Sequence, residues 1–133
     1  MTYLLDTNTC IRYLNGRSPQ VRSNLESLSP EEVALCSVVK AELSYGAARA
    51  RHPERTMAHI ATFASPFTSL PFDDSCADRY GQIRAQLEQA STPIGPNDLM
   101  IAAIALAHGL TLVTHNTREF GRVAGLILAD WEV

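Results

Sequence analysis

Short apolar runs alternate with amphipathic stretches along this chain, a pattern typical of strands alternating with helices. The apolar runs predict strands at Tyr3–Leu5, Val33–Cys36, Ser69–Phe72, Leu110–Thr114 and Leu126–Ala129. Capping residues and apolar positions at helical spacing predict helices at Cys10–Asn15, Pro19–Ser29, Ser37–Arg51, Pro53–Ala64 and Asp73–Gln89, and a last helix from Pro96 to the stop at Gly109. The alternation predicts an α/β fold, a three-layer α/β/α sandwich around a five-stranded parallel sheet.

Length and composition predict a single-domain protein without a membrane-spanning segment. A chain of 133 residues predicts one domain over residues 1–133, and no apolar run approaches the roughly 20 residues of a membrane span. The N-terminus lacks a basic segment followed by a secretory apolar stretch, which predicts no export. The three cysteines are far apart and show no metal-ligand spacing, so we expect reduced, packed thiols in a cytoplasmic protein.

The net charge of −3 at first argues against a nucleic-acid partner. The distribution of the cations changes this picture, because ten of the eleven are arginines and several of them cluster. The arginine side chain is a rigid fork that suits phosphate, although solvated arginine-rich faces are also common. The charge alone therefore does not decide whether the arginines bind nucleic acid or only form a solvated surface.

Four carboxylates stand where the fold needs no acid, and each also has an ordinary explanation. Asp6, directly after the first strand, is a possible helix cap, and Asp98 complements the dipole of the helix that it opens. Glu42 has no local cation to pair with, so it must reach solvent or a distant arginine. Glu119 is placed to pair with Arg122 one turn away.

The predicted topology brings these acids to one place. Asp6 and the Thr114–Glu119 stretch follow the carboxyl ends of strands, and Glu42 and Asp98 lie near the starts of helices, which begin at that same edge. Clustered carboxylates raise one another's pKa unless a cation lies among them. Hard oxygen ligands favour Mg²⁺ or Mn²⁺, and such a cluster suits phosphodiester hydrolysis.

Several motifs carry a resemblance to a known family. The segments are "LLDTN", "SVVKAELSYGA", "IGPNDLMIAAIALAHGLTLVTHNTREF" and the closing "LILADW". Together they resemble PIN-domain ribonucleases and, more narrowly, the VapC toxins of type II toxin–antitoxin pairs. The resemblance covers essentially the whole chain and implies the five-stranded fold expected above.

The acidic set of the family carries over by position. Asp6 of "LLDTN", Glu42 of "AEL" and Asp98 of "GPND" match the first three acids. Many PIN domains carry an aspartate where this chain has Asn116, so Glu119 of "REF" is the replacement acid that the resemblance favours. Asn116 then binds a metal water or positions Glu119.

The resemblance also implies roles for neighbouring hydroxyls and for the acids. Thr7 and Thr114 match positions where a hydroxyl orients the acids. Asp6, Asp98 and Glu119 are expected to hold Mg²⁺ or Mn²⁺, with Glu42 as a further ligand or as the group that orients the attacking water. With one acid replaced by an amide, one metal ion is expected to bind tightly and a second only with RNA.

The substrate and the partners follow from the same resemblance. It implies endonucleolytic cleavage of structured RNA of the translation machinery, with tRNA favoured over rRNA. It further implies a VapB-type antitoxin that directs a basic side chain towards the acids, a homodimer within a larger complex, and operator DNA bound only through the antitoxin.

Three other classes share part of the pattern. A haloacid-dehalogenase-type phosphatase needs an acid two residues after its first aspartate, where this chain has Asn8. A receiver domain needs a late lysine, and the only lysine is Lys40. A non-catalytic PIN-like module that binds RNA or protein stays open because of Asn116.

Overall fold

The computed structural model describes all residues from Met1 to Val133. Its strands are β1 (Tyr3–Leu5), β2 (Val33–Cys36), β3 (Thr68–Leu70), β4 (Thr111–Val113) and β5 (Leu128–Ala129). Its helices are α1 (Thr7–Leu14), α2 (Pro19–Glu26), a 3₁₀ turn η1 (Pro30–Glu32), α3 (Ser37–Ala48), α4 (Pro53–Ala64), α5 (Asp74–Gln89), α6 (Pro96–His108) and α7 (Thr117–Phe120).

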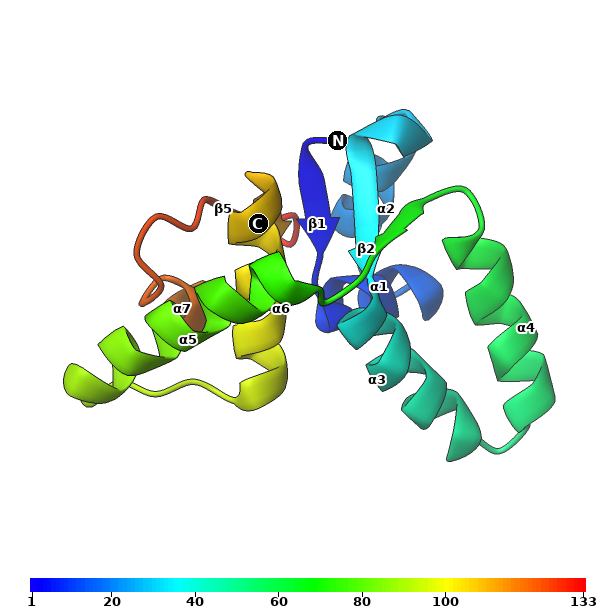
Figure 1. The fold of residues 1–133 in the computed structure, drawn as a ribbon. Coiled ribbons are helices and arrows are strands. Elements are labelled where there is room, and N and C mark those ends of the chain that lie inside the picture. The colour runs from blue at the N-terminus through cyan, green and yellow to red at the C-terminus, as the bar shows by residue number, and fades with distance from the viewer.

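The five strands form one parallel sheet in the order β3-β2-β1-β4-β5. In Figure 1, β1 and β2 point downwards, α1 and α3 begin near their lower ends, and α2 lies behind the strands. Helix α5 runs from near the lower end of β1 to the lower left and passes in front of α6. The predicted α/β class and the five-stranded parallel sheet between helices are confirmed.

The chain leaves β1 in one direction for β2 and β3, and later returns to the other side of β1 to form β4 and β5. β1 and β4 are therefore neighbours at the point where the strand order reverses. Ligands of open parallel sheets bind beyond the carboxyl ends of the strands at such a point. The topology thus marks the lower end of β1 in Figure 1 as the place for a site.

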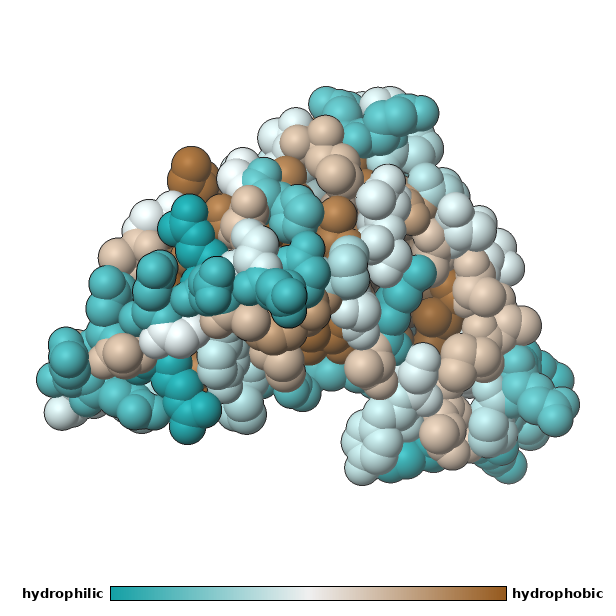
Figure 2. Space-filling view, in the orientation of Figure 1, coloured by the Kyte–Doolittle hydropathy of each residue, from teal (hydrophilic) through white to brown (hydrophobic).

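The core is one cluster of 33 buried apolar residues. Strands β1, β2 and β4 supply its centre, and α6 is buried without interruption from Ile101 to Ala105. The visible outer face of α5 is mostly hydrophilic, whereas a hydrophobic area lies between the strands and α4 (Figure 2). None of the helices combines the length and the apolar character that a membrane crossing requires.

Several predicted boundaries were wrong for local physical reasons. The first helix begins at Thr7 rather than Cys10, because the Asp6 side chain itself caps it. Ser37 is the first residue of α3 and not its cap, and its Oγ accepts the Phe72 N–H at 3.3 Å. The third strand ends at Leu70, before Pro71, which has no N–H to donate to a ladder.

Two short elements were not predicted, and two helices are shorter than expected. The 3₁₀ turn η1 and helix α7 are only three and four residues long, too short to show helical periodicity. Helix α2 ends at Glu26 and α3 ends at Ala48. The stop after α6 is confirmed, since Gly109 has a left-handed φ of 64°.

We expect Ile101→Ala to lower the free energy of unfolding by roughly 2–5 kcal/mol, the usual range for emptying a fully buried aliphatic site. Ile101 has no exposed surface. The control is Met57→Ala, since Met57 is 40% exposed. Urea denaturation of both variants measures the difference, and equal losses would contradict the assignment of α6 to the core.

Candidate functional site

The site begins with Asp6 at the carboxyl end of β1. Leu5 is paired in register with Val113 of β4, and the Asp6 N–H donates to the Val113 carbonyl at 3.1 Å. The Thr9 hydroxyl donates to the same carbonyl at 3.2 Å. Asp6 is therefore held against the end of β4 by its own backbone and by the first turn of α1.

The Asp6 carboxylate is buried, with 4% of the residue exposed. Its Oδ1 accepts the Thr9 N–H at 2.8 Å, so the capping explanation of this residue is confirmed. Burial raises the pKa of Asp6, and hydrogen bonds from Thr114 and Thr9 offset part of that rise. A cap on an exposed helix end needs no such burial, so capping alone does not account for the position of Asp6.

Glu42 lies on α3 and is half-buried. Its Oε1 accepts the Thr7 hydroxyl at 2.5 Å, and its Oε2 accepts the Asn97 amide at 3.4 Å. Glu42 therefore accepts hydrogen bonds from two neutral donors and does not pair with a distant arginine, which was one of the two alternatives that the sequence allowed. The orienting hydroxyl expected at Thr7 is present, whereas Asn97 was missed, although it precedes Asp98 in "GPND".

The end of β4 leads to Thr114, Asn116 and Glu119. The Asn116 N–H donates to the buried Thr114 hydroxyl oxygen at 2.9 Å, and the Asn116 amide donates to Glu119 Oε2 at 3.2 Å. The alternative pairing of Glu119 with Arg122 is wrong, because the Arg122 guanidinium donates to the Pro93 carbonyl instead. Asn116 thus directs Glu119, the arrangement expected for this residue pair.

Asp98, in the first turn of α6, shows that the four acids share one environment. Burial and, after it, the negative charges of Glu42, Asp6 and Glu119 together raise its pKa from 3.8 to about 6. Three acids from three other segments of the chain therefore act on this carboxyl. The structure brings together all four acids that the sequence singled out.

No side-chain cation neutralises this group. The three ion pairs of the chain join Arg12 to Glu132, Arg84 to Glu88 and His115 to Asp130, and none includes any of the four acids. A buried like-charge cluster without a counter-ion is unfavourable. Carboxylate oxygens with supporting hydroxyls and amides form a donor set that fits a hard divalent cation such as Mg²⁺ or Mn²⁺.

A polar cleft of about 510 Å³ adjoins the acids at Asn116. It is lined by Asn8, Ile11, Arg12, Asn15, Arg17, His115, Asn116 and Glu132. Two guanidinium groups and several amides are groups that bind phosphate and sugar oxygens. The cleft thus supplies positive charge directly beside the acidic edge of the sheet.

The amino-acid sequence of this chain is similar to a known protein family and to several known ribonucleases. The family model described as "PIN domain" matches residues 3–126. A tRNA(fMet)-specific endonuclease VapC of Shigella flexneri is 42% identical over 131 residues, which are 98% of this chain and 98% of that protein. Ribonuclease VapC2 of Rickettsia felis is 39% identical over 133 residues, covering 99% of each.

The fold has close relatives among solved structures. The crystal structure of VapBC2 from Rickettsia felis, bound to a DNA fragment from its promoter, superposes with a TM-score of 0.92. The match has 38% sequence identity and covers 98% of this chain and 99% of that chain. The agreement therefore extends over nearly the whole chain.

We expect Asp98→Asn to raise the melting temperature of the metal-free protein at pH 7. The folded chain binds the Asp98 proton more tightly than the unfolded chain does, so this group destabilises the fold increasingly as the pH rises from 3.8 to about 6. Calorimetry should show a smaller gain at pH 4, where the carboxyl is protonated. Asp78→Asn on the exposed face of α5 is the control, and an equal gain there would contradict the prediction.

Proposed function

The chain belongs to the PIN-domain family and, within it, to the VapC ribonucleases, and on this premise we propose that it is a toxin that cleaves tRNA. The support for tRNA is the name of the Shigella relative, a tRNA(fMet)-specific endonuclease. The observation that carries the proposal is the convergence of three carboxylates on a fourth, Asp98, at the reversal of the strand order. Hydrolysis of a phosphodiester bond is the reaction that this acidic edge suits best.

A divalent cation belongs to the proposal, with Mg²⁺ preferred and Mn²⁺ as the alternative. Its fit is supported by the all-oxygen donors and by the raised pKa values of Asp6 and Asp98, which a cation would lower. When bound, such an ion supplies a polarised water and charge stabilisation for the cleaved phosphate. We assign Asp6, Asp98 and Glu119 as its ligands.

The remaining residues of the site hold these carboxylates in place. Glu42, oriented by the Thr7 hydroxyl and the Asn97 amide, serves as a further ligand or holds the attacking water. Asn116 fixes Glu119, and Thr114 supports both Asn116 and Asp6. Because Asn116 is neutral, the site has one negative charge fewer than it would have with an aspartate at this position. This favours one tightly bound ion and a second that binds only with RNA.

The RNA strand is proposed to lie along the polar cleft. Arg12, which pairs with Glu132 of the same cleft, and Arg17 provide its guanidinium groups, and both line the cleft together with Asn116 at the acids. Most contacts between proteins and nucleic acids go to phosphate and sugar, which such side chains bind without reading sequence. A net charge of −3 is compatible with this role, because the negative charge is concentrated where a metal ion would offset it.

The proposed partner is a VapB-type antitoxin that covers the toxin and presents a basic side chain to the acids. Solved relatives are VapBC complexes, one of them bound to promoter DNA, which supports operator binding through the antitoxin. We further propose that residues 1–133 act as one domain, that the toxin dimerises within the complex, and that it acts in the cytoplasm, where tRNA takes part in translation. One continuous core supports the single domain.

We expect Asp6→Asn, Asp98→Asn and Glu119→Gln each to lower the rate of tRNA(fMet) cleavage by more than about 100-fold. Removing a residue that only supports a metal ligand typically lowers activity or metal affinity by up to about 100-fold, so removing a ligand itself should cost more. Cleavage of labelled tRNA with Mg²⁺ measures the rate, with Asp78→Asn as the control.

Asn116→Ala tests the fourth position separately, and an unaffected Glu119→Gln would contradict the choice of Glu119. A different outcome would favour a non-catalytic module: tight RNA binding by the parent protein without cleavage and without Mn²⁺ binding. Phosphatase activity on small esters without RNA cleavage would favour the haloacid-dehalogenase-type alternative.

We expect Thr7→Val to lower the cleavage rate or the Mn²⁺ affinity by about 10- to 100-fold, the usual loss when a partner of a ligand is removed. The substitution keeps the shape of the side chain and removes only the hydroxyl that Glu42 accepts. Thr7→Ser keeps that hydroxyl and should retain most of the activity. Equal activity of the valine and serine variants would show that Glu42 needs no such orientation.

A further inference from the structure

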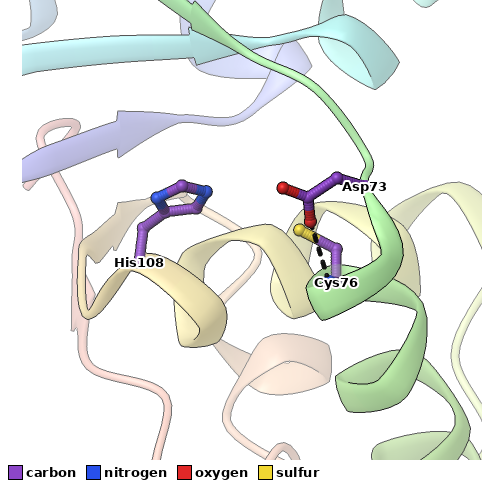
Figure 3. A group of neighbouring side chains, drawn as sticks. All are labelled: Asp73, Cys76 and His108. Atoms are coloured by element: carbon purple, nitrogen blue, oxygen red, sulfur yellow. Dashed lines mark hydrogen bonds between the residues drawn. The ribbon is translucent and has the colours of Figure 1, made fainter.

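A second group of metal-ligating side chains lies at the opposite end of α6 from Asp98. It consists of Asp73, Cys76 and His108, and one ligand atom from each lies within 4.8 Å of the others. Figure 3 shows the His108 ring, on the last turn of α6, facing the Asp73 carboxylate and the Cys76 sulfur at the start of α5. Asp98 and His108 are separated by about 15 Å of helix, so this group is separate from the acidic site.

The three side chains come together because α5 and α6 pack antiparallel. Asp73 caps α5, and Cys76 lies on its first turn, while His108 is the final residue of α6. Residues 76 and 108 are too far apart in sequence to show a recognisable ligand spacing, so only the packing of the two helices reveals the group. The prediction of reduced, packed cysteines is confirmed, and the proximity of Cys76 to His108 is an additional feature that no sequence spacing showed.

Each side chain has a free ligand atom. Asp73 Oδ1 accepts the Cys76 N–H at 3.1 Å, which leaves the other carboxylate oxygen available. The Cys76 thiol donates a long hydrogen bond, at 3.8 Å, to the Pro71 carbonyl, and it also interacts with the Asp73 carboxylate. His108 is exposed and makes no side-chain hydrogen bond or ion pair.

The spacing fits a bridging cation better than direct contact. Hydrogen bonds from Cys76 chiefly lower the pKa of Asp73 and His108 adds a smaller effect, yet no ion pair between Asp73 and His108 forms within 4.0 Å. Zinc bonds of about 2.1 Å to nitrogen and oxygen hold such atoms roughly 3.4 Å apart in a tetrahedral site. Closing the group therefore needs a movement of about 1 Å by two exposed side chains.

The chemistry of the group separates it from the nuclease metal. Thiolate and imidazole are soft or intermediate ligands that select Zn²⁺ over Mg²⁺. Burial raises the pKa of the Cys76 thiol, which disfavours a free thiolate in the metal-free chain, whereas a bound cation would favour the thiolate. Zinc binding would displace the thiol proton to solvent as the sulfur–metal bond forms.

We propose that Asp73, Cys76 and His108 form a binding site for Zn²⁺ or a similar soft divalent cation, with water as the fourth ligand. The ion ties the start of α5 to the end of α6. Because it binds the folded chain and not the unfolded one, it stabilises the fold in proportion to its concentration. Its occupancy is independent of the acids that we assign to RNA cleavage.

The test uses the reduced, metal-free full chain and Co²⁺ as a spectroscopic substitute for Zn²⁺. We expect the near-ultraviolet band of a cobalt–thiolate bond together with visible bands of tetrahedral cobalt, and their loss on addition of Zn²⁺ but not of excess Mg²⁺. Cys76→Ala should abolish the thiolate band, and His108→Gln should lower the affinity by more than about 10-fold, the smallest loss typical of even indirect metal partners. His108 is exposed, so this variant keeps the test valid if Cys76→Ala does not fold.

Matched controls decide the assignment. Cys36→Ala removes another buried cysteine, and His52→Gln removes another exposed histidine, and both should keep the bands. Asp98→Asn should also keep them, which distinguishes this site from the nuclease site. Absence of a thiolate band in the parent protein, or an equal band in Cys76→Ala, would overturn the proposal.

Discussion

The parallel pairing of β1 with β4 is the constraint on which the rest of the site depends. It places Asp6 beside the end of β4, and the Val113 carbonyl accepts from both the Asp6 N–H and the Thr9 hydroxyl. Because the strand order reverses here, segments from both halves of the sheet reach the same edge. Without this pairing the first acid and the Thr114–Glu119 segment would have no reason to meet.

The fold brings four carboxylates together although their burial and their like charges are unfavourable. Asp6 and Asp98 bind their protons more tightly than free carboxyls do, chiefly because they are buried, and Asp98 is further affected by the other three acids. Neutral donors, namely Thr7, Asn97 and Asn116, orient the carboxylates without cancelling their charge. The fold thus tolerates a local destabilisation that a bound divalent cation would remove, which is the usual relation between stability and function at such sites.

Much of the fold and of the acidic edge could be predicted from the sequence. Strand β2 and helix α4 were predicted to the residue, because buried apolar runs and a proline at the helix start are strong local signals. The four acids were recognised by their lack of local partners. The hydrogen bond from Asn97 to Glu42 and the meeting of Cys76 with His108 could not be predicted, since each depends on how two helices pack and not on any local pattern.

Helix α6 is fully buried from Ile101 to Ala105, directly after the turn that holds Asp98. Asp98 cannot shift without moving the centre of the core. Its position is therefore set by the packing of α6 and not by local contacts of its own. For the toxin activity proposed for this chain, the consequence is that activity depends on the integrity of the core. A substitution that disturbs the packing of Ile101 to Ala105 would then displace Asp98 and lower the activity without changing any of the four acids.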